Sequence, residues 1–455
     1  MKTLHYDVAV LGGGPGGTVA AIAAARCGAR TLLAEQDGYL GGALTRCGVS
    51  PMMTFHAGKT QVVRGIPQEI VSRLEKEGFS PGHLPDPVAF VSSVTPFDPE
   101  GMKTVLEDMV RESGADLLYH SIYTACGVEN DKVKTVVLRT KGGLLRVEAK
   151  VFVDATADAD LCADAGVPTQ LGRESDGLSQ PMTMMMRVSG VDSAALEQYQ
   201  KQHPEEIYQK DAAKVAAAPH TGISGAYGIL REAKQAGEIT YNREAVLCFE
   251  TNTPGEFAVN MTRVAKKSPV DPFELSQAET EGRHQAMETF RFLRKRIPGF
   301  EHCRLVSTGP EIGVRESRKI RGLYCITADD LVSNRMFPDA VSMGGYPIDL
   351  HSPDNRSQTS YRMLKPGSWY SIPYRALVPE NFCNLLVAGR CVSATQEALA
   401  AIRLSPVLMA FSQGAGTAAA QAACSGEDLR RIDVGALRAE LLHRGAFLTP
   451  YSDGG

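Results

Sequence analysis

The order of elements in the first 35 residues constrains the fold of this chain more than any other feature. Residues 6–11 form a short apolar run that predicts a buried parallel strand, and a glycine-rich loop follows immediately at 12–17. Residues 18–27 are rich in alanine and predict a helix ending at Gly28, and residues 29–34 predict a second strand before Glu35. This is the order of a dinucleotide-binding unit of about 30 residues.

The glycines of this loop have separate expected roles. Gly12 permits the tight turn, Gly14 lets the backbone approach a pyrophosphate, and Gly17 lets the helix pack closely on the strand. The N-terminus of the helix offers free N–H groups and a positive dipole to the phosphates, and Glu35 is placed to accept hydrogen bonds from a ribose diol. The residues that we expect to bind the dinucleotide here are Gly12, Gly14, Pro15, Gly16, Gly17 and Glu35.

The loop after Glu35 indicates which dinucleotide is bound. It begins at Gln36 and ends with Gly41 and Gly42, and it resembles the loop that runs beside FAD in flavoproteins of the glutathione-reductase-like superfamily. The resemblance implies that Gln36, Gly41, Gly42 and Thr45 contact FAD. Disulfide reductases of that superfamily carry a redox cysteine pair just beyond the loop, whereas this chain has only Cys47 there. A thiol–disulfide enzyme is therefore disfavoured.

Three further segments are similar to the "FAD-dependent oxidoreductase" family, which is related to the fumarate-reductase and heterodisulfide-reductase flavoproteins. Residues 151–160 resemble its "DATGDAD" strand and turn, with Ala157 where the family usually has glycine, and residues 315–318 resemble its "R-E-S-R" segment. Residues 384–390 form an apolar strand that ends in Gly-Arg, before a helix that begins near Ser405. The resemblance covers about residues 1–175 and 300–425, and the positions that it adds to the FAD site are Ala155, Thr156, Asp158, Gly389, Arg390 and Ser405.

The fold class that follows is α/β. We expect a Rossmann-like FAD-binding domain, with a parallel sheet and helices on its faces, at 1–170 and 380–455. We expect an inserted α+β substrate or cap domain at 171–379. The family resemblance implies that the helix beginning near Ser405 points its positive end at the flavin, where it stabilises charge on the reduced ring. No second G-x-G-x-x-G follows a strand, so electrons are expected to come from the substrate or from a partner docked at the flavin.

Five residues near these segments are candidates for catalysis. A histidine can act as general base, and an arginine can bind a carboxylate or carbonyl oxygen. Structural roles compete with this hypothesis: Arg403 can hold an FAD phosphate, Arg315 can pair with Glu316 or Glu311, and His351 can cap a turn. The candidates are His56, His351, Arg403, Arg315 and Arg375.

Composition excludes several partners and cofactors. The chain has 48 Lys and Arg against 52 Asp and Glu, with no basic block, so nucleic acid is a poor partner. Its ten cysteines form no C-x-x-C pair, and we expect neither an iron–sulfur cluster nor a metal site. The uncharged stretches 8–25 and 404–426 contain helix-breaking or polar residues and are interpreted as buried elements, not membrane spans. With no secretory signal evident, a cytoplasmic location is expected.

The function hypothesis is an FAD-dependent dehydrogenase or reductase that transfers a hydride between flavin N5 and a small organic substrate. One alternative is a flavin electron-transfer subunit that works with an iron–sulfur partner protein. Another is an NAD(P)H-dependent flavin monooxygenase, although those enzymes usually show a "GD" segment where this chain has Gly389 and Arg390. Homo-oligomerisation is left open.

Overall fold

A mostly parallel sheet forms the centre of the computed structural model, which describes residues 1–208, 218–354 and 359–449. Strand β1 (Lys2–Leu11) lies between β2 (Thr31–Ala34) and β10 (Gly143–Asp154), and both neighbours run parallel to it. Strand β7 (Asp116–Leu118) continues the sheet beyond β2. Strand β22 (Leu385–Val387), from far along the chain, pairs in parallel with the last three residues of β10. The predicted parallel α/β fold is therefore confirmed.

The first half of β10 has a different partner from the second half. Residues 143–148 pair with the antiparallel strand β9 (Lys132–Thr140), which pairs in turn with β8 (Ile122–Glu129). The short helix α4 (Asp160–Ala165) packs on β8 and β10. Strand β10 thus joins the antiparallel strands β8 and β9 to the parallel part of the sheet, and its carboxyl end lies between β1 and β22.

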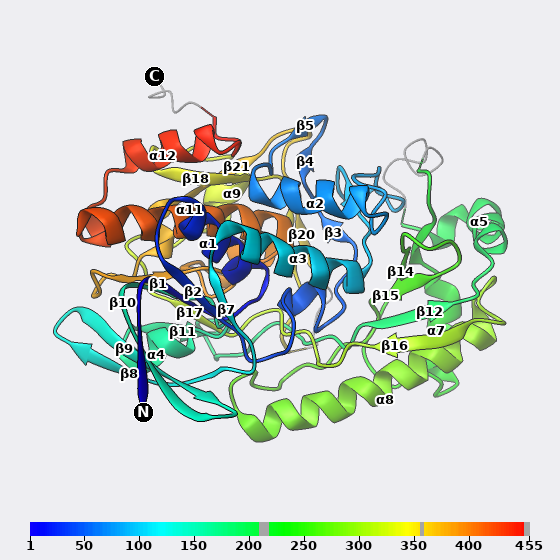
Figure 1. Ribbon diagram of the computed structural model, residues 1–455. Helices are drawn as coiled ribbons and strands as arrows, with labels where there is room; N and C mark the ends of the chain where they lie inside the picture. The colour runs from blue at the N-terminus through cyan, green and yellow to red at the C-terminus, as the bar shows by residue number, and fades with distance from the viewer. Residues whose placement is uncertain (209–217, 355–358, 450–455) are drawn as a thin grey trace.

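Two helices made of small residues pack on the central sheet. Helix α1 (Pro15–Arg26) and helix α11 (Ser405–Ser425) contact each other and both contact β1 and β10. They approach so closely that a Cβ on Gly416 would lie 2.0 Å from the Ala20 carbonyl oxygen. Figure 1 shows the red-orange α11 beside the blue α1, so the two ends of the chain build this region together. The helices that complete it are α2 (Ile66–Lys76), α3 (Pro99–Ser113), α10 (Gln396–Ile402) and α12 (Val434–His443).

Helix α11 is almost wholly buried, as the uncharged stretch 404–426 led us to expect. In the described part of the chain no single helix is long and apolar enough to span a membrane. Only α10 and α11 taken together reach that length and apolarity, and the pair is bent by 94°.

A second, antiparallel sheet forms the core of the middle region and lies on the right in Figure 1. Its strand order is β13 (Gly222–Gly225), β14 (Val246–Glu250), β15 (Phe257–Val259), β12 (Met186–Ser189) and β16 (Arg304–Thr308). The helices of this region are α5 (Ser193–Gln202), α7 (Tyr227–Gln235) and the long α8 (Pro272–Arg296). Its buried side chains, Phe257, Phe292 and Phe300 among them, form a hydrophobic cluster separate from that of the parallel sheet.

Side chains of residues 320–354 and 359–378 contribute to the first hydrophobic cluster. Tyr370 and Met343 are buried with Val10 of β1 in one cluster. The short elements of the chain not yet named are β3 (Met52–Met53), β4 (His56–Ala57), β5 (Thr60–Gln61), β6 (Val94–Thr95), β11 (Thr169–Leu171), β17 (Arg318–Ile320), α9 (Ala328–Val332), β18 (Ala340–Gly344), β19 (Ile348–Leu350), β20 (Ser360–Arg362) and β21 (Tyr370–Pro373). The domain boundaries at 170/171 and 379/380 stay a prediction.

Candidate functional site

A cavity of about 660 Å³ extends from the glycine loop before α1 to the space between the antiparallel sheet and β19. Both ends of the chain and the middle region contribute to its lining. Of the residues predicted to bind FAD, those that line it are Gly14, Pro15, Gly16, Gly17, Gln36, Gly42, Ala155, Thr156, Asp158, Gly389, Arg390 and Ser405. Of the predicted catalytic residues, His351, Arg403 and Arg315 line it.

Gly14 has no structural need to be glycine. Its φ of −63° and ψ of 179° suit any residue. A Cβ built on it would meet no protein atom within 4 Å, because it would project into the cavity. No side chain caps the first turn of α1, so its N-terminus is open to an anion. The space beside Gly14 is therefore kept clear for a ligand and not for packing.

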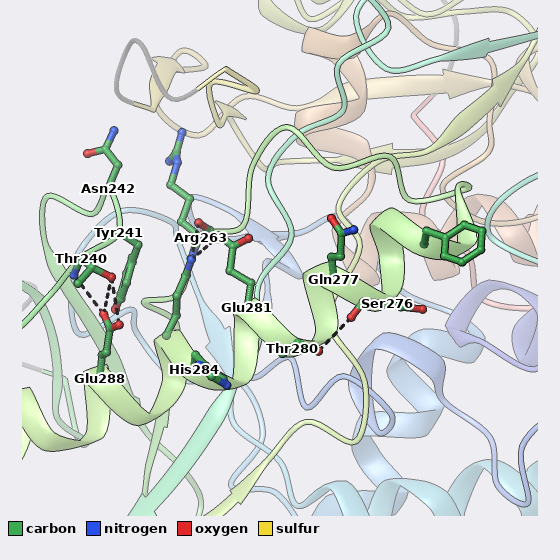
Figure 2. Close-up of a pocket in the computed structure, with 12 residues that line it drawn as sticks. Thr240, Tyr241, Asn242, Arg263, Ser276, Gln277, Thr280, Glu281, His284 and Glu288 are labelled. Atoms are coloured by element: carbon green, nitrogen blue, oxygen red, sulfur yellow. Dashed lines mark hydrogen bonds between the residues drawn. The ribbon is translucent and has the colours of Figure 1, made fainter.

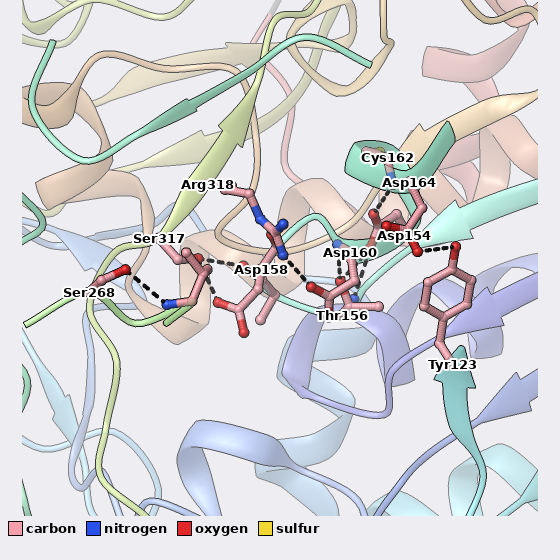
Figure 3. Close-up of polar contacts among 12 residues, drawn as sticks. Tyr123, Asp154, Thr156, Asp158, Asp160, Cys162, Asp164, Ser268, Ser317 and Arg318 are labelled. Carbon is pink, nitrogen blue, oxygen red and sulfur yellow. Dashed lines mark hydrogen bonds and ion pairs between the residues drawn. The ribbon is translucent and has the colours of Figure 1, made fainter. Parts of the chain in front are cut away.

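The turn after β10 is held by the segment that resembles "R-E-S-R". The Ser317 hydroxyl donates to Asp158 Oδ1 at 2.6 Å, and Arg318 Nε donates to the Asp158 carbonyl oxygen at 2.7 Å (Figure 3). Arg390 Nη2 donates to the same Asp158 carboxylate at 2.5 Å. Asp154, at the end of β10, accepts from the backbone N–H and hydroxyl of Thr156. These contacts fix the turn where it lines the cavity.

Ala157 in this turn departs from the family pattern. Its φ is +70°, in the left-handed region that favours glycine. Its neighbours Thr156 and Asp158 line the cavity with it. The sequence left open whether this position needs a positive φ, and the structure answers that it does.

The N-terminus of α11 also opens onto the cavity. Leu404, Ser405 and Leu408 line it, and no side chain caps the first turn of the helix. Arg403 lies immediately before this turn, and its Nε is buried without a hydrogen-bond partner. A positive helix end and an unpartnered guanidinium donor both favour negative charge at this place.

Four residues predicted to contact FAD lie behind the lining. Gly12 makes the tight turn with a φ of +104°, and a Cβ there would lie 2.3 Å from the Ala155 carbonyl oxygen. The buried Glu35 carboxylate accepts from the backbone N–H groups of Gly13, at 2.5 Å, and Asp37, at 2.8 Å. Gly41 and Thr45 shape the second loop, where the Thr45 hydroxyl donates to the Leu40 carbonyl oxygen at 2.7 Å.

Two predicted catalytic residues lie outside the lining of this cavity. His56 Nδ1 lies 3.0 Å from the Ser93 hydroxyl, and its ring stands edge-on to His83 at 5.0 Å between centroids. The guanidinium of Arg375 donates two hydrogen bonds to the Asp339 carboxylate, so its charge is paired there. The chain does approach the cavity near His56, but through Pro51 and Met53.

The enclosed end of the cavity contains a hydrogen-bonded group around His351. Its Nε2 lies 3.5 Å from Asp349 Oδ2, and its Nδ1 lies 3.0 Å from the Thr359 hydroxyl. The Tyr346 hydroxyl donates to the same Asp349 oxygen at 3.3 Å, whereas the other, Oδ1, is buried without a partner. The imidazole ring of His351 therefore lies between a carboxylate and a hydroxyl.

Burial and neighbouring charges set the protonation of this group. Burial, with the nearby Arg315 adding to it, lowers the pKa of His351 to about 3. Burial alone would raise the pKa of Asp349, but His351, Arg403 and Arg315 hold it well below its usual value. At neutral pH the imidazole is therefore uncharged, and one of its ring nitrogens can accept a hydrogen bond.

Arginines surround this end. Arg315 donates to the Pro181 carbonyl oxygen at 2.6 Å and to the Thr183 hydroxyl at 2.5 Å, and burial beside Arg403 lowers its pKa to about 9. Arg243 donates to the Ala245 and Asn260 carbonyl oxygens. Arg263 also lines the cavity, where it donates to the Ser352 carbonyl oxygen. Three guanidinium groups therefore bring positive charge to this end.

A second, more open hollow of about 930 Å³ lies between α8 and the loop before β14. Figure 2 shows Thr240 bonded to Glu288 of α8 on one side and Gln277, Thr280 and Glu281 along the helix. Asn242 and Arg263 line both this hollow and the larger cavity, so they form the wall between the two.

The described residues contain no group of three or more His, Cys, Asp or Glu side chains suited to a metal ion. Cys47 lines the cavity, but burial raises the pKa of its thiol to about 12. A thiol of that pKa has no reactive thiolate at neutral pH.

Comparison with known proteins decides the family. A family model described as FAD dependent oxidoreductase matches residues 7–441. The chain belongs to the FAD-dependent oxidoreductase family. FAD is its cofactor, and the open space beside Gly14, the two uncapped helix N-termini and the fixed Asp158 turn fit that group.

Individual relatives of this FAD-dependent oxidoreductase are distant. Digeranylgeranylglycerophospholipid reductase of Thermoplasma volcanium is 28% identical over 199 residues, which are 40% of this chain and 47% of that protein. Dihydrolipoyl dehydrogenase of Trypanosoma brucei brucei is 54% identical over 46 residues, 10% of each chain. The chain thus matches less than half the length of these curated relatives.

One solved structure supports the fold of the whole chain. A geranylgeranyl bacteriochlorophyll reductase-like protein of Thermoplasma acidophilum has a TM-score of 0.50 and 15% identity, covering 97% of this chain and 83% of that one. At this identity the likeness concerns the fold alone.

Several residues of the cavity were not among those predicted. Arg243 and Arg263 come from the middle region, and Asp349 and Tyr346 precede the predicted His351. The charged and aromatic residues in the segment 346–351 were a usable signal for the last two. Nothing local in the sequence distinguishes the two arginines from surface arginines.

Proposed function

We propose that this FAD-dependent oxidoreductase is a dehydrogenase or reductase that moves a hydride between flavin N5 and a small organic substrate. The observation that carries the proposal is the continuity of one cavity, from the nucleotide loop at Gly14 to the proton-accepting group at His351. Bound FAD supplies the two-electron chemistry. The enclosed end, with Tyr346 and Asp349 buried or half-buried, supplies a place for a small molecule.

The residues of the chain have two tasks in this proposal. Arg315 and Arg403 orient the substrate by charge-assisted hydrogen bonds. His351, held between Asp349 and Thr359, takes up or returns the proton that accompanies hydride transfer at the substrate.

The test is anaerobic mixing of the FAD-loaded protein with a panel of reduced metabolites, followed by the flavin absorbance. We expect at least one small organic compound to bleach the flavin rapidly. His351→Ala should slow that bleaching by about 10²-fold or more while the FAD content stays unchanged.

Two outcomes would contradict the proposal. Bleaching by NAD(P)H alone, followed by oxygen-dependent hydroxylation, would identify a monooxygenase. Bleaching only with a co-purified iron–sulfur protein would identify an electron-transfer subunit. His56→Ala is the matched comparison: if it slows bleaching as much as His351→Ala, the assignment of the proton acceptor is wrong.

A further inference from the structure

The arginines of the enclosed end lack the partners that buried arginines usually have. Within the ranges that the structure describes, no carboxylate lies within ion-pair distance of Arg243, Arg315 or Arg403. Arg46 and Arg390, elsewhere in the same cavity, do have such partners, in Glu311 and Asp158. Of the arginines without a carboxylate partner, Arg315 and Arg403 lie within electrostatic reach of Asp349 and His351.

The positive charge of this end exceeds the negative charge facing it. Arg403, Arg243 and Arg263 each contribute to lowering the pKa of Arg315, so the four cations lie within electrostatic reach of one another. The carboxylates that oppose them there are Asp349 and Glu244. Because Arg243, Arg315 and Arg403 have no carboxylate within ion-pair distance in the described ranges, an anion bound here would offset their charge.

Two unpartnered polar atoms narrow the chemistry of that anion. Arg403 Nε is a buried donor without an acceptor, and Asp349 Oδ1 is a buried acceptor without a donor. A carboxylate satisfies the first atom, but it would be repelled by the second. A hydroxyl satisfies the second, because the ionised carboxylate of Asp349 accepts its hydrogen.

Three aromatic side chains form another part of the cavity wall. Phe90 stands edge-on to Tyr346 at 5.9 Å and to Tyr361 at 5.3 Å between ring centroids. All three residues line the cavity. They offer an apolar surface to the carbon body of a ligand whose polar groups meet Arg403 and Asp349.

From these contacts we infer that the substrate is a small organic acid that carries a hydroxyl beside its carboxylate. This inference rests on the proposed function, since it names the substrate class of the same cavity. Arg315 and Arg403 bind the carboxylate, and Asp349 accepts the hydroxyl hydrogen. Oxidation would then break the carbinol C–H bond with its electron pair leaving as hydride to oxidised FAD, and the hydroxyl proton would pass to the Asp349–His351 group, leaving a 2-oxo acid.

Calorimetric binding to the FAD-loaded protein tests the inference with matched probes. Mandelate carries both groups, mandelamide lacks the charge, and phenylacetate lacks the hydroxyl; lactate, lactamide and propionate form a smaller series. In at least one series we expect the hydroxy acid to bind tenfold or more tightly than its amide. We expect it to bind several-fold more tightly than the acid without the hydroxyl.

Substitutions of the two arginines test whether they cause the tighter binding of the hydroxy acid than of its amide. Arg315→Gln and Arg403→Gln should each weaken binding of the hydroxy acid by tenfold or more and leave amide binding unchanged, at unchanged FAD content. Arg73→Gln is the control, because Arg73 pairs with Glu69 and Glu112 away from the cavity. Equal binding of acid and amide, no binding in either series, or unchanged binding in both arginine variants would overturn the inference.

The outcome is separable from that of the proposed function. Acids that bind as expected while no compound bleaches the flavin would refute hydride transfer and leave the anion site standing. Bleaching by neutral compounds alone would refute the anion site and leave hydride transfer standing.

Discussion

His351 Nε2 lies 3.5 Å from the carboxylate of Asp349, which is part of β19, and His351 follows the last residue of that strand, Leu350. Only 12% of the His351 side chain and 14% of the Asp349 side chain are exposed. The pair is therefore largely shielded from bulk solvent, and burial is the main cause of the lowered pKa of His351.

This environment predicts a pH dependence of stability. The folded protein lowers the pKa of His351 to about 3, whereas the unfolded chain has an ordinary value of about 6.5. Below about pH 6.5 the unfolded chain binds a proton that the folded protein does not, so stability falls as the pH falls. Between pH 7 and pH 5 this amounts to about 2 kcal/mol at most.

The measurement compares wild type with His351→Gln by urea unfolding at pH 7 and pH 5. The free energy of unfolding of wild type should drop more than that of the variant over this interval. His83 and His220 also have lowered pKa values, so only the difference between the two proteins isolates His351. An equal drop in both would show that folding does not lower the pKa of His351.

Gly14→Val should abolish FAD binding and leave the fold intact. The valine side chain would occupy cavity space, and the backbone of Gly14 already has a conformation that valine adopts. Flavin absorbance of the purified variant measures the first effect and far-UV circular dichroism the second. Gly142→Val, in the exposed turn between β9 and β10, is the control that should keep its FAD. Full flavin content in Gly14→Val would mean that the nucleotide loop is misassigned.

Ala157→Gly should stabilise the protein. Alanine with a φ of +70° carries a cost of about 1–2 kcal/mol, and glycine removes it at an entropic cost of about 0.5–1 kcal/mol. We expect a net gain of up to about 1 kcal/mol in chemical unfolding at constant FAD. Ala163→Gly in helix α4 should instead lose about 0.5–1 kcal/mol, because that residue is helical. A loss in both variants would contradict the strain inferred at Ala157.

Lys319→Met should be strongly destabilising. Lys319 Nζ lies 2.6 Å from Glu316 Oε1, with side-chain exposures of 2% and 0%. Removing one partner leaves a buried charge uncompensated, which costs about 3–5 kcal/mol. Glu316→Gln with Lys319→Met should recover part of that loss in thermal unfolding. If the double variant is no more stable than Lys319→Met, the pair does not behave as a coupled unit.

The nucleotide-binding half was predictable because its signal is local. The strand, the glycine loop with Gly14, the helix and Glu35 follow one another within one unit, and each has its own residue pattern. The contribution of β22 and of helix α11 was predicted from the family resemblance of residues 384–390 and of the helix beginning near Ser405. No local pattern indicates that β22 pairs with β10, because the two strands lie far apart in the sequence.

The end of the cavity beside β19 was predictable only in part. His351, Arg315 and Arg403 were recognised from nearby motif segments, and all three reach the cavity. His56 was chosen because it follows the glycine-rich loop, but the side chain bonds to Ser93 instead. Arg243 reaches the cavity from the antiparallel sheet region, and such long-range placement depends on tertiary packing that no local pattern reports.

The pairing of β22 with β10 also bears on how the protein is made. The ribosome delivers β10 long before Leu385–Val387, so the edge of the sheet at Phe152–Asp154 waits without its partner while the middle region is synthesised. Gly389, Arg390 and Ser405, which close the cavity, come later still. The lining of the cavity that fits FAD is therefore complete only after the ribosome has passed Ser405.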